Sequence, residues 1–173
     1  MRTWILGTVA ASGLLLASAP FGQASAQALP PGVGAVMPFD IPYGAPISLS
    51  LAEKVASAAV ARAAELHWKE AIAIVDPSGE LVYFVRMDGT QIASVDIAQD
   101  QARAAARYRR STKVFQDAVD KGFPYLMTLR GVVASEGGVP LILDGKLIGA
   151  IGASGGTSPQ DGVVAAAGVA AVK

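Results

Sequence analysis

Two apolar runs separated by Asp144 and Gly145 constrain the fold of this chain more than any other feature. The runs cover residues 139–143 and 147–151, and Asp-Gly between such runs is a strong β-hairpin signal, because both turn residues must accept positive φ. The second run leads into a glycine-rich bend at residues 155–156, followed by a predicted helix. A strand, a flexible backbone and a helix N-terminus therefore meet at one place, which favours the anionic groups of a small-molecule ligand.

The N-terminal residues have the pattern of a bacterial secretory signal peptide. Arg2 gives a positive start, residues 5–17 are apolar, and residues 24–26 fit a small-x-small cleavage site, with residues 26–28 as a second choice. The apolar run is too short to span a membrane, since a spanning helix needs about 20 residues. We expect residues 1–26 to be removed and the protein to be periplasmic or secreted; an uncleaved anchor is the alternative.

Residues 27–47 form a second region, an arm rich in proline and glycine. Such a composition predicts an extended segment that wraps its own domain or a neighbouring subunit, or else a disordered leader. Residues 48–173 follow as a single predicted domain, and their number suits one hydrophobic core.

The composition excludes several classes of function. The chain has no cysteine and one histidine, so disulfides, thiolate chemistry, cysteine metal sites and multi-histidine metal centres are not expected. Its 14 basic and 14 acidic residues balance, which gives no reason to expect a nucleic acid or, after cleavage, a membrane as partner. Small residues are abundant, and this favours close packing of helices on a sheet.

Hydrophobic periodicity and turn signals predict an α+β domain with one mainly antiparallel, twisted sheet flanked by helices. Ser50 and Glu53 fit a capping box, Ser94 is expected to cap the second helix, and residues 126–133 are ambiguous between loop and strand. Apart from the hairpin, the expected helices cover residues 50–66, 94–108, 111–121 and 158–172, and the expected strands cover residues 71–76 and 80–86.

The second predicted helix has a narrow, smooth face. This face is built from alanines at positions 98, 102, 105 and 106. A large planar ligand or a closely packed helix could lie against it, and the close helix is the commoner outcome.

Five motifs follow one another at residues 74–82, 86–88, 97–102, 137–140 and 149–155. In this order they resemble the GlcG/HbpS-like haem-binding family, which includes the C-terminal domain of PduO-type proteins. The resemblance implies a profilin-like fold with a five-stranded antiparallel sheet. It also implies homo-oligomers, often octamers, and binding of haem or a related tetrapyrrole.

The chain departs from the family pattern in its central region. Gln101 and Ala104 stand where the family usually has lysine and threonine, and Ser111 stands where proline is common. The change at Gln101 removes a cation from the wall of the pocket that the family resemblance predicts.

The residues that we expect to bind a cofactor come mainly from the resemblance. Arg86 could pair with a carboxylate and Met87 could be a soft axial ligand of haem, whereas local pairing of Arg86 with Asp88 and gap filling by Met87 are the structural alternatives. The complete predicted set is Arg86, Met87, Asp88, Arg103, Gly137, Gly138, Ser154 and Gly155.

Basic residues at helical spacing add a second possibility. Arg103, Arg107 and Arg110 could receive haem propionates or another dianion, or they could form a solvated face that complements the helix end. His67 is the only imidazole and hence the candidate metal ligand, although a histidine at a helix C-terminus is also favoured by the helix dipole alone.

Two carboxylates are candidates for acid–base chemistry. Glu136 adjoins the Gly137-Gly138 pair, and Asp161 lies near the start of the last helix, where Ser158 as cap would make it an N3 residue. The favoured function is an exported, oligomeric protein that binds haem or a related tetrapyrrole. A metal-independent enzyme for a small carbonyl or carboxylate compound and a structural or sensory homo-oligomer are the alternatives.

Overall fold

The computed structural model describes residue 34 and residues 36–173; the expected signal peptide and residues 27–33 lie outside this range. In the described part, no helix has both the length and the apolar character needed to cross a membrane. The elements from Met37 onward are α1 (Leu49–Glu65), β1 (Ala71–Val75), β2 (Leu81–Arg86), α2 (Ser94–Tyr108), α3 (Lys113–Asp120), the 3₁₀ helix η1 (Pro124–Thr128), β3 (Gly138–Leu143), β4 (Lys146–Ser154) and α4 (Ser158–Val169).

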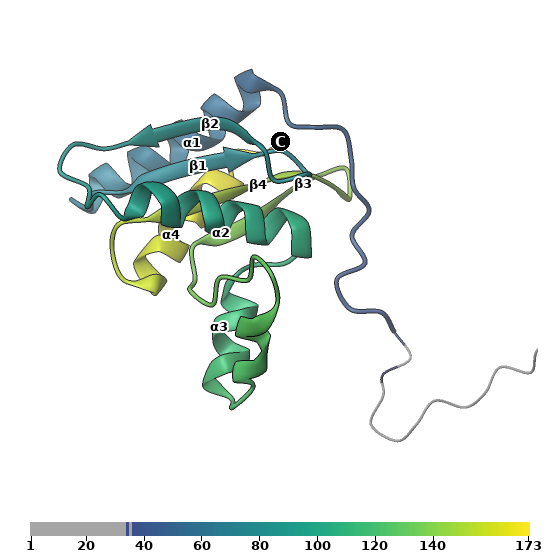
Figure 1. The fold of residues 1–173 in the computed structure, drawn as a ribbon. Coiled ribbons are helices and arrows are strands. Elements are labelled where there is room, and N and C mark those ends of the chain that lie inside the picture. The colour runs from purple at the N-terminus through teal and green to yellow at the C-terminus, as the bar shows by residue number, and fades with distance from the viewer. Residues whose placement is uncertain (1–33, 35) are drawn as a thin grey trace, which may run out of the picture. The chain divides into compact units, whose positions relative to one another are not determined.

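The strands form one antiparallel sheet in the order β2-β1-β4-β3 (Figure 1). This confirms the predicted α+β class and the hairpin, whose turn residues Asp144 and Gly145 have φ of 49° and 72°. The expectation of five strands was wrong: residues 36–173 contain four. The ambiguous segment 126–133 adds no strand, because its first part continues η1 and the rest is loop.

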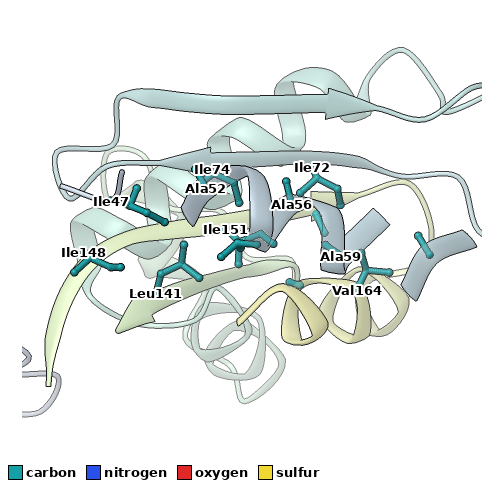
Figure 2. Close-up of a cluster of buried hydrophobic side chains, with 14 residues drawn as sticks. Ile47, Ala52, Ala56, Ala59, Ile72, Ile74, Leu141, Ile148, Ile151 and Val164 are labelled. Atoms are coloured by element: carbon teal, nitrogen blue, oxygen red, sulfur yellow. The ribbon is translucent and has the colours of Figure 1, made fainter. Parts of the chain in front are cut away.

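One face of the sheet carries the larger apolar side chains. Ile72 and Ile74 of β1 and Ile151 of β4 are fully buried there, against the alanines and Val55 of α1 and against Val164 of α4 (Figure 2). Alternation along a strand sends every second side chain to the same face, so the isoleucines gather on this side. The main hydrophobic core therefore lies between the sheet and the α1–α4 pair.

The opposite face of the sheet is made of small residues, and α2 covers it. The α2 alanines 98, 102, 105 and 106 are fully buried against Ala71, Ala73 and Ala150. A Cβ on Gly152 of β4 would overlap the carbonyl oxygen of Ala98. The neighbour of this alanine face is therefore the sheet, and the expectation of a close helix against it was wrong.

The capping residues of three helices differ from the sequence-based expectation. Ser48, not Ser50, caps α1, because Ser48 is extended and its Oγ accepts the N–H of Leu51 at 3.3 Å. Ala93, not Ser94, occupies the cap position of α2. Thr157, not Ser158, caps α4, and the Oε1 atom of Gln160 accepts the Thr157 N–H at 2.8 Å.

The described end of the arm lies on its own domain. The N–H of Gly44 donates to the oxygen of Leu147 at 2.7 Å, and the N–H of Ile47 donates to the oxygen of Ile148 at 2.8 Å. Tyr43 forms an isolated parallel bridge with Leu147. These bonds occupy the part of β4 that β1 does not reach, since β1 pairs with β4 only from Ala150 onward.

Candidate functional site

The pocket that best matches the predicted chemistry lies between α2 and the loop that follows η1. Its volume is about 350 Å³, at the small end of the usual range for ligand pockets. The lining combines three guanidinium groups, one aromatic ring and two valines, with a single carboxylate. These residues are Asp100, Arg103, Arg107, Tyr108, Arg130, Gly131, Val132 and Val133. We call this the arginine pocket.

The three arginines differ in how far their charge is already neutralised. Arg103 bonds to Asp100 at 3.1 Å and to Gln99 at 3.1 Å. Arg107 donates to the Ser78 carbonyl at 2.8 Å, and a second guanidinium nitrogen lies 3.6 Å from a carboxylate oxygen of Glu80. Within residues 36–173, the guanidinium of Arg130 has neither a salt bridge nor a hydrogen bond to protein. Arg130 is therefore the cation most available to an anionic ligand.

The predicted basic stripe divides into two parts. Arg103 and Arg107 face the arginine pocket, but Arg110 stacks over the Phe39 ring with its Cζ 3.8 Å from the centroid. Arg109 donates to the Ile41 carbonyl at 3.0 Å and lies 3.6 Å from Asp40. The C-terminal end of the stripe thus holds the arm.

The glycine-rich bend after β4 already has an anionic partner within the chain. The Oδ1 atom of Asp161 accepts the N–H groups of Gly155 at 3.1 Å and Gly156 at 2.9 Å. A Cβ on Gly155 would overlap the carbonyl oxygen of Lys69. The anion-binding geometry expected at this bend exists, and the side chain that uses it belongs to the first turn of α4. Asp161 is therefore not the N3 cap, a position that Gln160 takes.

The Gly137-Gly138 pair is equally close to neighbouring atoms. Gln101, fully buried, donates from Nε2 to the Glu136 carbonyl at 3.1 Å, and its side chain lies against Gly137. Thr112 accepts the Gly138 N–H at 3.0 Å. Gln101 therefore holds the loop before β3 through its hydrogen bond to Glu136, and it does not line the arginine pocket.

Ser154 is also enclosed. It is 3% exposed and donates to the Oγ of Ser94 at 3.1 Å. This bond explains why Ser94 does not cap α2: its hydroxyl faces the sheet.

A buried carboxyl pair lies next to the bend. Glu70, immediately before β1, is fully buried, and neither carboxylate oxygen has a hydrogen-bond partner when the group is ionised. Burial and the adjoining Asp161 carboxylate raise the pKa of Glu70 to about 8. Burial also raises the pKa of Asp161, to about 6, although the N–H groups of Gly156 and Gly155 act in the opposite direction.

Glu136 lies close to this pair. Its side chain packs beside Gly162 in the first turns of α4, and its charge adds to the rise in the pKa of Asp161. The two predicted acid–base residues are thus brought together, with Glu70 as a third carboxyl. In residues 36–173 no group of three or more histidine, cysteine, aspartate or glutamate side chains is arranged to hold a metal ion.

The remaining predicted residues lie apart from the arginine pocket and from the carboxyl group cluster of Glu70, Glu136 and Asp161. Arg86 and Asp88 are exposed at the end of β2, where the described residues show no salt bridge between them, and Met87 packs against the main core. His67 is exposed with φ of 58° after α1, and the N–H of Trp68 bonds to the Ala63 carbonyl at 2.9 Å. This is a Schellman helix ending, with His67 in the left-handed position. The helix ending therefore explains the backbone conformation of His67 without a bound ligand.

Sequence reasoning missed two residues, Glu70 and Arg130. Glu70 directly precedes the apolar strand 71–75, and a charged residue at the start of a buried strand is a signal that could have marked it. Arg130 lies in the ambiguous segment and carries no periodicity signal.

The fold and the arginine pocket define a small α+β domain with one four-stranded antiparallel sheet and a basic pocket at one side. A family model described as haem degrading protein HbpS-like matches residues 47–170. The chain belongs to this HbpS-like family, as its motifs indicated.

Two relatives are similar to this chain over most of their own length, and a third, longer one is similar over part of it. An uncharacterized 15.0 kDa protein of Citrobacter freundii is 38% identical over 70% of this chain and 88% of its own. Protein GlcG of Escherichia coli is 36% identical over 62% of this chain and 81% of its own. The corrinoid adenosyltransferase PduO of Salmonella typhimurium is 33% identical, and the match spans only 40% of that longer protein.

Solved structures share the fold. A PduOC:heme complex has a TM-score of 0.68 and 30% identity over 74% of this chain and 96% of that chain. A double mutant of Streptomyces reticuli HbpS has a TM-score of 0.70 and 27% identity over 86% of this chain and 99% of that one.

Proposed function

We propose that this protein binds haem, or a related flat tetrapyrrole with carboxylate groups, at the arginine pocket. The observation that carries the proposal is the similarity, at 30% identity, to a protein whose structure was solved as a haem complex. The arginine pocket supplies the matching chemistry in this chain. The predicted glycine positions contribute less, because groups of the chain itself lie against them.

The residues of the arginine pocket fit the carboxylates and the ring face of haem. Arg130 offers a guanidinium without a protein carboxylate, and hydrogen bonds between a guanidinium and a carboxylate are among the stronger ones. Tyr108, Val132 and Val133 offer apolar surface to a ring. The hydroxyl of Tyr108 donates to the Arg130 carbonyl at 2.9 Å, so the aromatic wall and the free cation are linked.

Haem binding is tested by titrating the purified protein with haemin and following the Soret band. We expect a shift that saturates at a fixed ratio of haemin to protein. Replacing Arg130 by alanine should weaken binding about tenfold or more, since one charge-assisted hydrogen bond contributes about 1.5–3 kcal/mol. No Soret shift with the wild-type protein would contradict the proposal.

A matched control is available among the arginines. Arg109 is held by Asp40 and Ile41 outside the pocket, so Arg109→Ala removes the same charge without touching the pocket lining. We expect its haemin affinity to stay within about twofold of the wild type, because Arg109 is already paired with Asp40 and does not line the pocket. Equal losses in both variants would indicate a general charge effect and would contradict the assigned site.

We further propose that the protein is exported after cleavage near residue 26 and assembles as a homo-oligomer. Support for assembly comes from apolar side chains exposed around η1, since contiguous apolar patches often mark interfaces. Phe123, Tyr125, Met127 and Leu129 are 49%, 62%, 52% and 42% exposed.

Light scattering tests this assembly. The double variant Tyr125→Ser/Met127→Ser should lower the molar mass of the particle, whereas an oligomer of unchanged mass would exclude this surface. Ile92 precedes α2, away from η1 in the sequence, and is 82% exposed, so Ile92→Ser is the control variant.

A further inference from the structure

The carboxyl of Glu70 presents an electrostatic problem that the proposed function leaves unexplained. The side chain is fully buried, and an ionised carboxylate without a partner in such a place is costly. The neighbouring group that can bond to it is Asp161, which is itself 4% exposed. Two carboxylates can form a hydrogen bond with each other only if one of them carries a proton.

The charges around the pair offer no compensation. Glu136 adds a negative charge near Asp161, and the ammonium of the adjacent Lys69 turns away toward Gly89. Arg86 and Asp88, which end β2 and begin the turn packed on the Glu70 backbone, are exposed. The first turn of α4 contains an acidic residue, Asp161, and no basic one. A bound proton is therefore the remaining way to remove one of the two buried negative charges.

The Glu70–Asp161 pair also lies where three segments of the chain meet. Asp161 holds the bend through the N–H groups of Gly155 and Gly156, and Glu70 packs against Gly155. The Glu70 carbonyl accepts the Thr90 hydroxyl at 3.1 Å and the Met87 N–H at 3.0 Å. The start of β1, the end of β4 and the first turn of α4 therefore meet at these two carboxyls.

We propose that Glu70 and Asp161 bind one proton between them, and that this buried proton closes the Gly155-Gly156 bend against the start of β1. Glu70 donates the proton to a carboxylate oxygen of Asp161, and the other acceptor sites of Asp161 hold the bend. Loss of the proton places two negative charges in one buried site and weakens the contact between the bend and the start of β1. This contact is thus sensitive to pH.

The direction of the pH effect follows from linkage. The pKa of Glu70 is about 8 in the folded protein and near its ordinary value of 4.5 when unfolded, so between these values only the folded state holds the proton. The stabilisation is complete below pH 4.5 and is lost as the pH rises toward 8. Asp161, with a folded pKa of about 6, acts in the same direction at lower pH. Between about pH 6 and pH 8 the effect therefore belongs to Glu70.

Denaturant unfolding of the full chain at a series of pH values tests whether the shared proton stabilises the fold. For the wild type, the contribution of Glu70 should raise the unfolding equilibrium constant by about tenfold per pH unit between about pH 6 and pH 8. Glu70→Gln should remove this dependence, because the amide donates a hydrogen bond to Asp161 without titrating. The control Glu136→Gln removes a neighbouring carboxyl and should retain it. Equal pH dependence in the wild type and Glu70→Gln would overturn the proposal.

A measurement on the wild type decides the question should Glu70→Gln fail to fold. Carboxyl carbon NMR should show one glutamate side chain still protonated at about pH 6.5, titrating near pH 8 together with the amide signals of Gly155 and Gly156. Spectra in which every glutamate is ionised at that pH would exclude the shared proton. Asp161→Asn should move the remaining glutamate titration to lower pH, because it removes the negative charge beside Glu70.

Discussion

Replacing Gly152 with alanine is expected to destabilise the domain by about 3 kcal/mol, because overpacking at a rigid contact has costs of this size. The added methyl group would overlap the carbonyl oxygen of Ala98 and come within 2.7 Å of the Ala102 nitrogen. Both are backbone atoms of α2, so no side chain can rotate away. The whole helix would have to move off the sheet.

The measurement is the free energy of unfolding by urea, with Gly162→Ala as the matched control. The three atoms nearest to a Cβ on Gly162 all belong to the flexible side chain of Glu136, which can turn away, rather than to the backbone. Alanine also favours a helix over glycine by about 1 kcal/mol, so this variant should be as stable as the wild type or slightly more stable. Comparable losses in the two variants would contradict the close packing of α2 on β4.

Much of this architecture is predictable from residue patterns. The Asp144-Gly145 hairpin follows from turn chemistry, and the alternation of large and small residues along β1 predicts a sheet covered on both sides. The number of strands was not predictable, because residues 126–128 belong to a 3₁₀ helix and residues 129–133 to a loop, where pattern alone allowed a strand. The capping residues were missed by one or two positions. Neighbouring serines and threonines competed for the cap at α1 and α4, whereas at α2 the Ser94 hydroxyl bonds to Ser154 and Ala93 takes the cap position.

The candidate site was less accessible to sequence reasoning. Glycines at Gly137, Gly138 and Gly155 suggested room for a ligand, but the same residues serve equally to let two parts of the chain approach closely, and only the fold distinguishes these uses. Arg103 could be selected from helical spacing. The roles assigned to Arg130 and Glu70 depend on residues far away in the sequence: Tyr108 for Arg130 and Asp161 for Glu70. No local sequence pattern contains such pairs.

Phe115→Ala should have the other large effect, a loss of about 3–5 kcal/mol in the free energy of unfolding. Phe115 is the one buried residue of α3, with 2% of its surface exposed. Its ring meets that of Tyr108 edge to face, with centroids 5.2 Å apart. Urea unfolding measures the loss, and Val114→Ala on the exposed side of the same helix should stay within about 1 kcal/mol of the wild type.

The same substitution should also weaken haemin binding, because Tyr108 forms part of the arginine pocket. A Tyr108 ring released from Phe115 has to be ordered when haemin binds, at a cost of about 0.5–1.5 kcal/mol, so the affinity should fall by up to about tenfold. The titration is made at a temperature where the variant remains folded, with Val114→Ala beside it. A Phe115→Ala protein that is destabilised yet binds haemin with unchanged affinity would place the ligand away from Tyr108 and the arginine pocket.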